Sequence, residues 1–318
     1  MAGERLPVKE RTLLFGDAKS LVGIITEPAQ SIPGRPAVIL LNAGILHRVG
    51  PNRVHVRLAR TLAEAGFLVM RFDYSGIGDS RPRADAMAFA RSALAETRQC
   101  MDLLQKMPRG SGGFLLAGIC SGADNALRAA VQDKRVVGVA LIEPHSIPAP
   151  GFILYHYRRK LLDPRSWWRL LRGRSELVGG LREEQAADKD GPVARAAPAA
   201  PPAPAPVSAP PAQVSPAAPE PAPDPDSIMP SRQEFVRQVR GLVDRGTGIC
   251  FVYSSESPAY FNYLSLLRRE LRRPRVAGRV RVQVLKQTDH VFTPLAVQDV
   301  LVQTIRGWAL TFGGEPGP

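Results

Sequence analysis

Cys120 stands in a local pattern that suits a catalytic nucleophile. It lies in LLAGICSGADNAL, residues 115–127, between an apolar run and a run of small residues. In a sharp strand-to-helix turn, the residues two positions before and after the central residue must be nearly free of side chain. Gly118 and Gly122 meet this condition around Cys120. Centring the turn on Ser121 would place an isoleucine there, so the spacing selects Cys120.

The helix expected after this turn would lower the pKa of the Cys120 thiol. A helix that begins at about residue 121 directs the positive end of its dipole at Cys120, which lowers the thiol pKa. The thiolate is the form that attacks a carbonyl carbon. The same pattern also fits an inert cysteine in a tight turn, because free cysteine is often buried. The position of the turn inside a strand–helix alternation favours the nucleophile.

Strands and helices alternate over most of the chain. We expect the first two strands to pair antiparallel through a short turn. The later alternation predicts an α/β fold, a mostly parallel sheet with helices on both faces. Strands are expected at 11–15, 20–28, 36–44, from 67, 112–120, 136–144, 248–256 and 279–288, and helices at 52–66, 84–107, 121–133, 231–244, 259–272 and about 295–312.

The alternation is interrupted in the middle of the chain, which predicts four segments. Residues 1–149 and 229–318 would form the two parts of one core domain. Residues 150–190 are basic and aromatic and would form a cap that buries a substrate. Residues 191–228 are rich in Pro and Ala, cannot build a packed core, and would form a disordered linker.

Composition and charge limit the function classes. The chain has 318 residues, 44% of them hydrophobic, and only three widely spaced cysteines, which argues for a reducing, cytoplasmic location. We expect neither a signal peptide nor a membrane-spanning helix. The net charge of +13 favours anionic partners. No metal-ligand spacing, nucleotide loop or nucleic-acid-binding module occurs, so we expect no metal, no cofactor and no nucleic-acid partner.

Several stretches together resemble a known superfamily. The sequences NAGILHRVGPNR, LARTLAEAGFLVMRFDYSGIGDS, GICSGAD and RRKLLDPRSWWRLLRGR are similar to α/β-hydrolases of the serine-aminopeptidase-like group, which includes the exosortase A system-associated hydrolases. Most relatives carry serine at the turn, whereas dienelactone hydrolases and polyhydroxyalkanoate synthases carry cysteine. The resemblance implies a hydrolase with a cap, in the setting of surface-polysaccharide or protein sorting.

The resemblance also implies a catalytic base. In α/β-hydrolases the chain order is nucleophile, acid, histidine. His290, in QTDHVFTP between the last expected strand and helix, occupies the place of the base. A loop histidine at the carboxyl edge of the sheet can also reach the turn physically. His55 is expected on the surface of a helix instead.

Two glutamates compete for the role of the acid. The family places a carboxylate after the strand 249–253, where this chain has Ser257 and, one residue earlier, Glu256. Glu256 fits the role of the acid if the turn after the strand 249–253 is shifted by one residue. Glu143, at the end of the preceding strand, is the alternative. A cysteine nucleophile tolerates either arrangement, because a thiolate–imidazolium pair forms readily.

The oxyanion of the reaction would be held by backbone N–H groups. One is expected from Ser121 and the other from Ala43 or Gly44, in the loop after the 36–42 strand. These residues predict hydrolysis of a small-molecule ester or thioester through an acyl-Cys120 intermediate. Acyl transfer by the same Cys–His pair, or a catalytically degenerate scaffold protein, are the alternatives. Residues 150–190 would contact a cap-bound substrate or an anionic membrane surface, and the oligomeric state stays open.

Overall fold

The computed structural model describes residues 8–30, 32–107, 112–144, 231–255, 257–268 and 278–313. All of them belong to one unit, formed by Met1–Pro150 and Pro223–Pro318. The predicted cap and linker lie outside the described residues, and so does Glu256.

Eight strands form a single sheet in the order β1-β2-β4-β3-β5-β6-β7-β8. β2 runs antiparallel to both its neighbours, β1 and β4, and every pairing from β4 through β8 is parallel. The strands are β1 Lys9–Phe15, β2 Leu21–Glu27, β3 Ala37–Leu41, β4 Val69–Phe72, β5 Phe114–Ile119, β6 Val136–Ile142, β7 Gly248–Ser254 and β8 Val280–Leu285.

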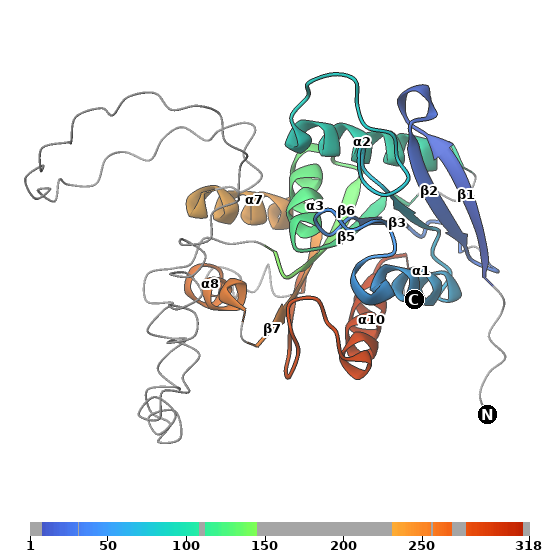
Figure 1. Cartoon of the computed structure of the whole chain (residues 1–318). Coiled ribbons are helices and arrows are strands. Elements are labelled where there is room, and N and C mark those ends of the chain that lie inside the picture. The colour runs from blue at the N-terminus through green and yellow to red at the C-terminus, as the bar shows by residue number, and fades with distance from the viewer. Residues whose placement is uncertain are drawn as a thin grey trace, which may run out of the picture. The chain divides into compact units, whose positions relative to one another are not determined.

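Helices cover both faces of this sheet (Figure 1). α2, α3 and α7 share one apolar cluster with one face, and α1 and α10 share another with the opposite face. The predicted α/β architecture is therefore confirmed. The helices are α1 Val54–Glu64, α2 Phe89–Gln105, α3 Ser121–Gln132, α7 Arg232–Asp244, α8 Pro258–Leu266 and α10 Leu295–Ala309, with short 3₁₀ turns η1 Asp17–Lys19 and η2 Pro51–Arg53.

One helix start differs from the prediction. The helix expected from residue 84 begins at Phe89, because Ala88 has an extended backbone. Upstream of it, Arg83 pairs with Asp85 at 2.6 Å and also reaches Glu96 on α2 at 3.3 Å. These pairs hold residues 83–85 as a loop against α2 rather than as its first turn.

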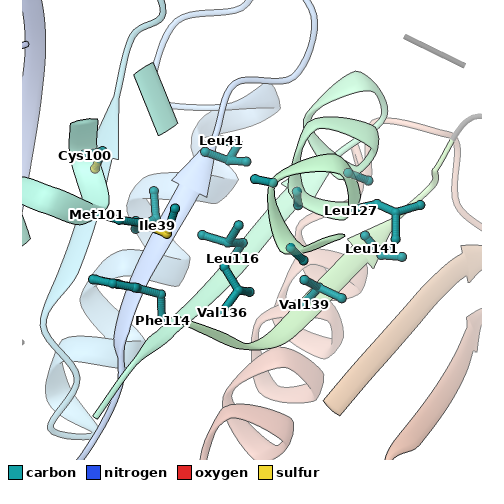
Figure 2. Packing of buried hydrophobic residues seen from close by; sticks show 14 of the residues in the cluster. Ile39, Leu41, Cys100, Met101, Phe114, Leu116, Leu127, Val136, Val139 and Leu141 are labelled. Carbon is teal, nitrogen blue, oxygen red and sulfur yellow. The ribbon is translucent and has the colours of Figure 1, made fainter. Parts of the chain in front are cut away.

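Side chains that point alternately to the two faces of the central strands form the two apolar clusters. On β3, Ile39 and Leu41 belong to the cluster under α2 and α3, whereas Val38 and Leu40 belong to the cluster under α1 and α10. Figure 2 shows the first cluster, in which Leu141 of β6 lies beside Leu127 of α3. Each such side chain contributes about 1.5–3 kcal/mol when fully buried. This packing on both faces fixes the ends of β5 and β6, which carry the candidate site.

Candidate functional site

Cys120 occupies the single-residue turn between β5 and α3. Its backbone has φ 58° and ψ −125°, a conformation that non-glycine residues rarely adopt. A Cβ on Gly118 would lie 2.2 Å from the carbonyl carbon of Gly122, and a Cβ on Gly122 would lie 2.5 Å from the carbonyl oxygen of Asn42. Both glycines are therefore required for the turn, and the turn is centred on Cys120 rather than on Ser121.

The three cysteines of the chain have different surroundings. Cys100 and Cys250 are fully buried, and burial raises the pKa of the Cys100 thiol and raises that of Cys250 to about 12. Cys120 is only partly buried. Cys120 is thus the cysteine that solvent and a substrate can reach.

His290 contacts Cys120 from the loop between β8 and α10. The side chains of Cys120 and His290 are hydrogen-bonded, and His290 Nδ1 lies 3.6 Å from Glu143 Oε2. These two contacts, with that to Cys120 the larger, raise the pKa of His290 to about 10, and partial burial opposes them. Both contacts favour the protonated imidazole, which is the charge state that stabilises a neighbouring thiolate.

Glu143 reaches His290 from the end of β6. The carboxylate is buried, and its Oε1 accepts a hydrogen bond from the backbone N–H of Ser254 at the end of β7. The Glu143 backbone has φ 49°, and its N–H donates to Val252 O at 2.9 Å. β6 and β7 thus hold the carboxylate on both sides and leave Oε2 for His290.

The loop after β3 lies against the start of α3. The Gly44 N–H donates to Ser121 Oγ at 2.8 Å, and Asn42 Nδ2 donates to Leu46 O at 2.8 Å. Ala43 is buried in the apolar cluster under α1 and α10, while Gly44 is exposed with φ 58°. The structure therefore brings the Gly44 amide to the hydroxyl of Ser121, the residue that follows Cys120.

A buried aspartate supports this loop. Asp73, after β4, accepts hydrogen bonds from Arg48 N at 2.6 Å, Asn42 Nδ2 at 3.2 Å and Asp79 N at 3.2 Å. The Arg48 guanidinium also pairs with Asp73, and with Asp79 at 2.6 Å. Gly78 has no room for a Cβ, which would stand 2.3 Å from Asp73 Oδ2. The Gly-rich loop at 73–80 therefore braces the residues that follow β3.

A second aspartate holds the loop of His290. Asp289 is exposed and accepts hydrogen bonds from Thr293 N at 2.8 Å and Thr293 Oγ1 at 2.6 Å. Asn52 Nδ2 donates to Val291 O at 3.3 Å from the other side of the loop. The contact between Asp289 and Thr293 has a local sequence signal, the D-x-x-x-T spacing. The contact between Asn52 and Val291 has none, because it joins residues 239 positions apart.

The structure contradicts one expectation about the histidines. His55 is not on the surface of its helix but is buried at 2% exposure, with its ring beneath Gly50, where a Cβ would lie 2.5 Å from His55 Cγ. Burial, together with the nearby Arg71 charge, lowers the pKa of His55 to about 4. The 3₁₀ turn η2 folds Gly50 over the first turn of α1, and helical periodicity alone does not show this.

The described residues contain no group of three or more His, Cys, Asp or Glu side chains placed to hold a metal ion. Within the same part of the chain, every helix is too short or too polar to cross a bilayer.

Comparison with solved structures identifies proteins that share this fold. The chain is similar to an esterase of Pyrococcus furiosus, with 12% identity, a TM-score of 0.52, and 97% of this chain and 92% of the other covered. It is also similar to a hypothetical protein of Pseudomonas aeruginosa (15% identity, TM-score 0.55, 98% and 97% covered). A dienelactone hydrolase of Anabaena variabilis is a third neighbour (10% identity, TM-score 0.51, 96% and 98% covered).

These neighbours show the α/β-hydrolase fold, which the sequence resemblance predicted. No protein-family model matches the chain, and no curated protein matches it in sequence.

Proposed function

We propose that this chain, which has the α/β-hydrolase fold, is an enzyme that cleaves an ester or thioester through a covalent acyl-Cys120 intermediate. The observation that carries the proposal is the position of His290, which contacts the accessible thiol of Cys120 on one side and the buried carboxylate of Glu143 on the other. The neighbouring esterase and dienelactone hydrolase folds support a hydrolase.

In the first half-reaction, Cys120 Sγ attacks the substrate carbonyl carbon as the thiolate. The carbonyl π electrons move to oxygen and form a tetrahedral oxyanion. When this intermediate collapses, the bond to the leaving alkoxide or thiolate breaks and His290 gives it a proton. The product is a free alcohol or thiol and a thioester on Cys120.

In the second half-reaction, water replaces the leaving group. His290, now neutral, takes a proton from water as the oxygen attacks the thioester carbonyl. The carbon–sulfur bond then breaks, which releases the acid and restores the thiolate beside protonated His290. The Glu143 carboxylate stabilises the imidazolium and orients the ring throughout. Backbone N–H groups near Ser121 and Ala43 stand beside the site where the oxyanion forms.

Glu143 is the carboxylate that we assign to this role. It contacts His290 directly, and its second oxygen is fixed by Ser254, so its orientation is set by the sheet. Glu256, the other sequence candidate, lies outside the described residues and stays a prediction.

Intact-mass spectrometry with p-nitrophenyl acetate tests the proposal. Wild-type protein should gain one acetyl group, and Cys120→Ala should gain none. Cys100→Ala and Cys250→Ala are matched controls, and each should still acetylate, because the thiols removed are buried. An acetyl group that survives in Cys120→Ala, or a wild type that gains none while its Cys120 alkylates normally, would refute the proposed nucleophile.

The same experiment separates the two alternatives. If an added alcohol or amine removes the acetyl group faster than water does, the enzyme is an acyltransferase. If no ester labels Cys120, the protein is a binding scaffold with this fold. An association with exosortase-dependent sorting, a cytoplasmic location and membrane contact through residues 150–190 stay predictions from the sequence.

A further inference from the structure

The hydroxyl of Ser121 contacts the loop that was expected to supply one backbone N–H to the oxyanion. Ser121 directly follows Cys120 and is the first residue of α3. Its Oγ accepts the Gly44 N–H at 2.8 Å. A hydroxyl has one hydrogen to donate and two lone pairs to accept with, so this bond leaves the O–H hydrogen free to donate.

Close packing fixes this hydroxyl in place. A Cβ on Gly122 would stand 2.5 Å from Asn42 O and 2.8 Å from Leu41 O, so the first turn of α3 lies directly against the end of β3. The loop that follows β3 is closed on itself, because Leu46 N–H donates to Ala43 O at 3.1 Å. The contact between Gly44 and Ser121 therefore joins two rigid segments.

The space next to this contact is open. Gly44 is exposed, and apart from its two chain neighbours no described residue has a heavy atom within 4 Å of the position that a Cβ on Gly44 would take. A substrate carbonyl can therefore approach this backbone. The single amide hydrogen of Gly44 is, however, already directed at Ser121 Oγ, so it cannot donate to an oxyanion at the same time.

We propose that the side-chain hydroxyl of Ser121, polarised by the Gly44 N–H, donates a hydrogen bond to the oxyanion formed when Cys120 attacks. The inference rests on the proposed function and adds a side-chain donor to the expected backbone donors. The Gly44 amide then acts on the oxyanion through Ser121, as the first member of a chain of two hydrogen bonds that strengthen each other. No proton is transferred in this step, because the hydroxyl only donates a hydrogen bond.

Two reactions of the same thiol test this role. Acylation by p-nitrophenyl acetate forms an oxyanion, whereas alkylation by iodoacetamide displaces iodide and forms none. Loss of one oxyanion donor costs about 100-fold or more in rate. We expect Ser121→Ala to acylate about 100-fold more slowly than wild type, and to alkylate at a rate within about twofold of wild type. Ser121→Thr keeps the hydroxyl and should restore most of the acylation rate.

Ser265→Ala is the matched control. Ser265 is exposed on α8, where its hydroxyl donates to Asn262 O at 3.0 Å, far in sequence from the turn. Both of its rates should equal those of wild type.

Three results would overturn the inference. Acylation of Ser121→Ala at the wild-type rate would mean that other donors hold the oxyanion. Equal losses in acylation and alkylation would mean that Ser121 only supports Cys120. A wild type that alkylates but never acylates would remove the proposed function itself, which the other two results leave standing.

Discussion

Replacing Glu143 by glutamine tests how much its charge supports His290. Glu143 Oε1 accepts the Ser254 N–H, and the glutamine oxygen can accept the same bond. Oε2, which lies 3.6 Å from His290 Nδ1, becomes an uncharged amide nitrogen. Glu143→Gln therefore keeps the size of the side chain and its tie to β7 but removes the negative charge beside the imidazolium.

The distance between the Glu143 carboxylate and the His290 ring sets how much the substitution changes the pKa of His290. Two unit charges 3.6 Å apart attract by about 1 kcal/mol in water and by about 5 kcal/mol at an effective dielectric constant of about 20. The side chain of His290 is 52% exposed, so solvent screening places the value near the lower limit. About 1.4 kcal/mol corresponds to one pKa unit and to a tenfold change in rate.

The direction of the pKa change follows from the positive charge of the protonated His290 ring. Contacts with Cys120 and Glu143 raise the pKa of His290 to about 10. Without the Glu143 charge, the His290 pKa should fall by about one unit, so the ring loses its proton at lower pH. An NMR titration of the His290 ring measures this directly. In parallel, kcat/KM for an unactivated alkyl ester, whose leaving group needs a proton, should fall about tenfold, and its alkaline limb should move by about one unit toward neutral pH.

Two further variants make the test specific. Glu64→Gln changes an exposed glutamate at the end of α1 and should leave the titration and kcat/KM at wild-type values. Glu256→Gln is measured alongside. If Glu143→Gln titrates and turns over like wild type while Glu256→Gln loses tenfold, the assignment of Glu143 is wrong and Glu256 orients the base.

Three further predictions concern stability. Gly118→Ala should lower the free energy of unfolding in urea by at least about 2 kcal/mol, since its Cβ would stand 2.2 Å from the backbone of Gly122. Gly241→Ala in α7 should instead raise the free energy of unfolding by up to about 1 kcal/mol, because a Cβ there would meet no described atom within 4 Å beyond its chain neighbours and the backbone of its own helix; equal effects would refute the steric account. Asp73→Asn should lower the free energy of unfolding by about 3 kcal/mol, because the partly buried Arg48 loses the buried one of its two carboxylate partners and keeps only the exposed Asp79; an unchanged thermal unfolding midpoint would show that the pair contributes little. Because burial lowers the pKa of His55 from 6.5 to about 4, the folded state binds fewer protons than the unfolded state in this window. Stability should fall by about 3 kcal/mol as pH drops from about 6.5 to about 4, and His55→Leu should flatten that slope in urea titrations; the same slope in His55→Leu would assign it to other groups.

The turn at Cys120 could be predicted because its determinants are local. Five consecutive residues specify it, and the two glycines are needed for contacts within those residues and with the strand next to β5. The sheet was equally predictable, since apolar runs such as 36–44 and 112–120 read directly as buried strands. In both cases residues close in sequence decide the structure.

The partner of His290 could not be settled from the sequence, because it depends on how three strands align. Glu143 follows β6 and its carboxylate is oriented by Ser254, 111 residues later at the end of β7. The pairing register of β6 and β7 sets this contact, and no local pattern encodes it. Burial of His55 was missed for the same kind of reason, since it depends on Gly50 folding back over α1.

Under the proposed function, Cys120 and the position of Glu143 fit each other chemically. The loop of His290 follows β8, at the edge of the sheet, whereas Glu143 follows β6, the strand beside β5 and Cys120. The 3.6 Å approach of Glu143 to His290 is longer than an ordinary hydrogen bond. A serine hydroxyl needs a firmly oriented neutral base to remove its proton during attack. A thiol can give its proton to His290 before the substrate arrives, so the carboxylate need only stabilise the charge of the resulting imidazolium. A charge at 3.6 Å can do this without ideal hydrogen-bond geometry, which is why a cysteine suits this arrangement better than a serine would.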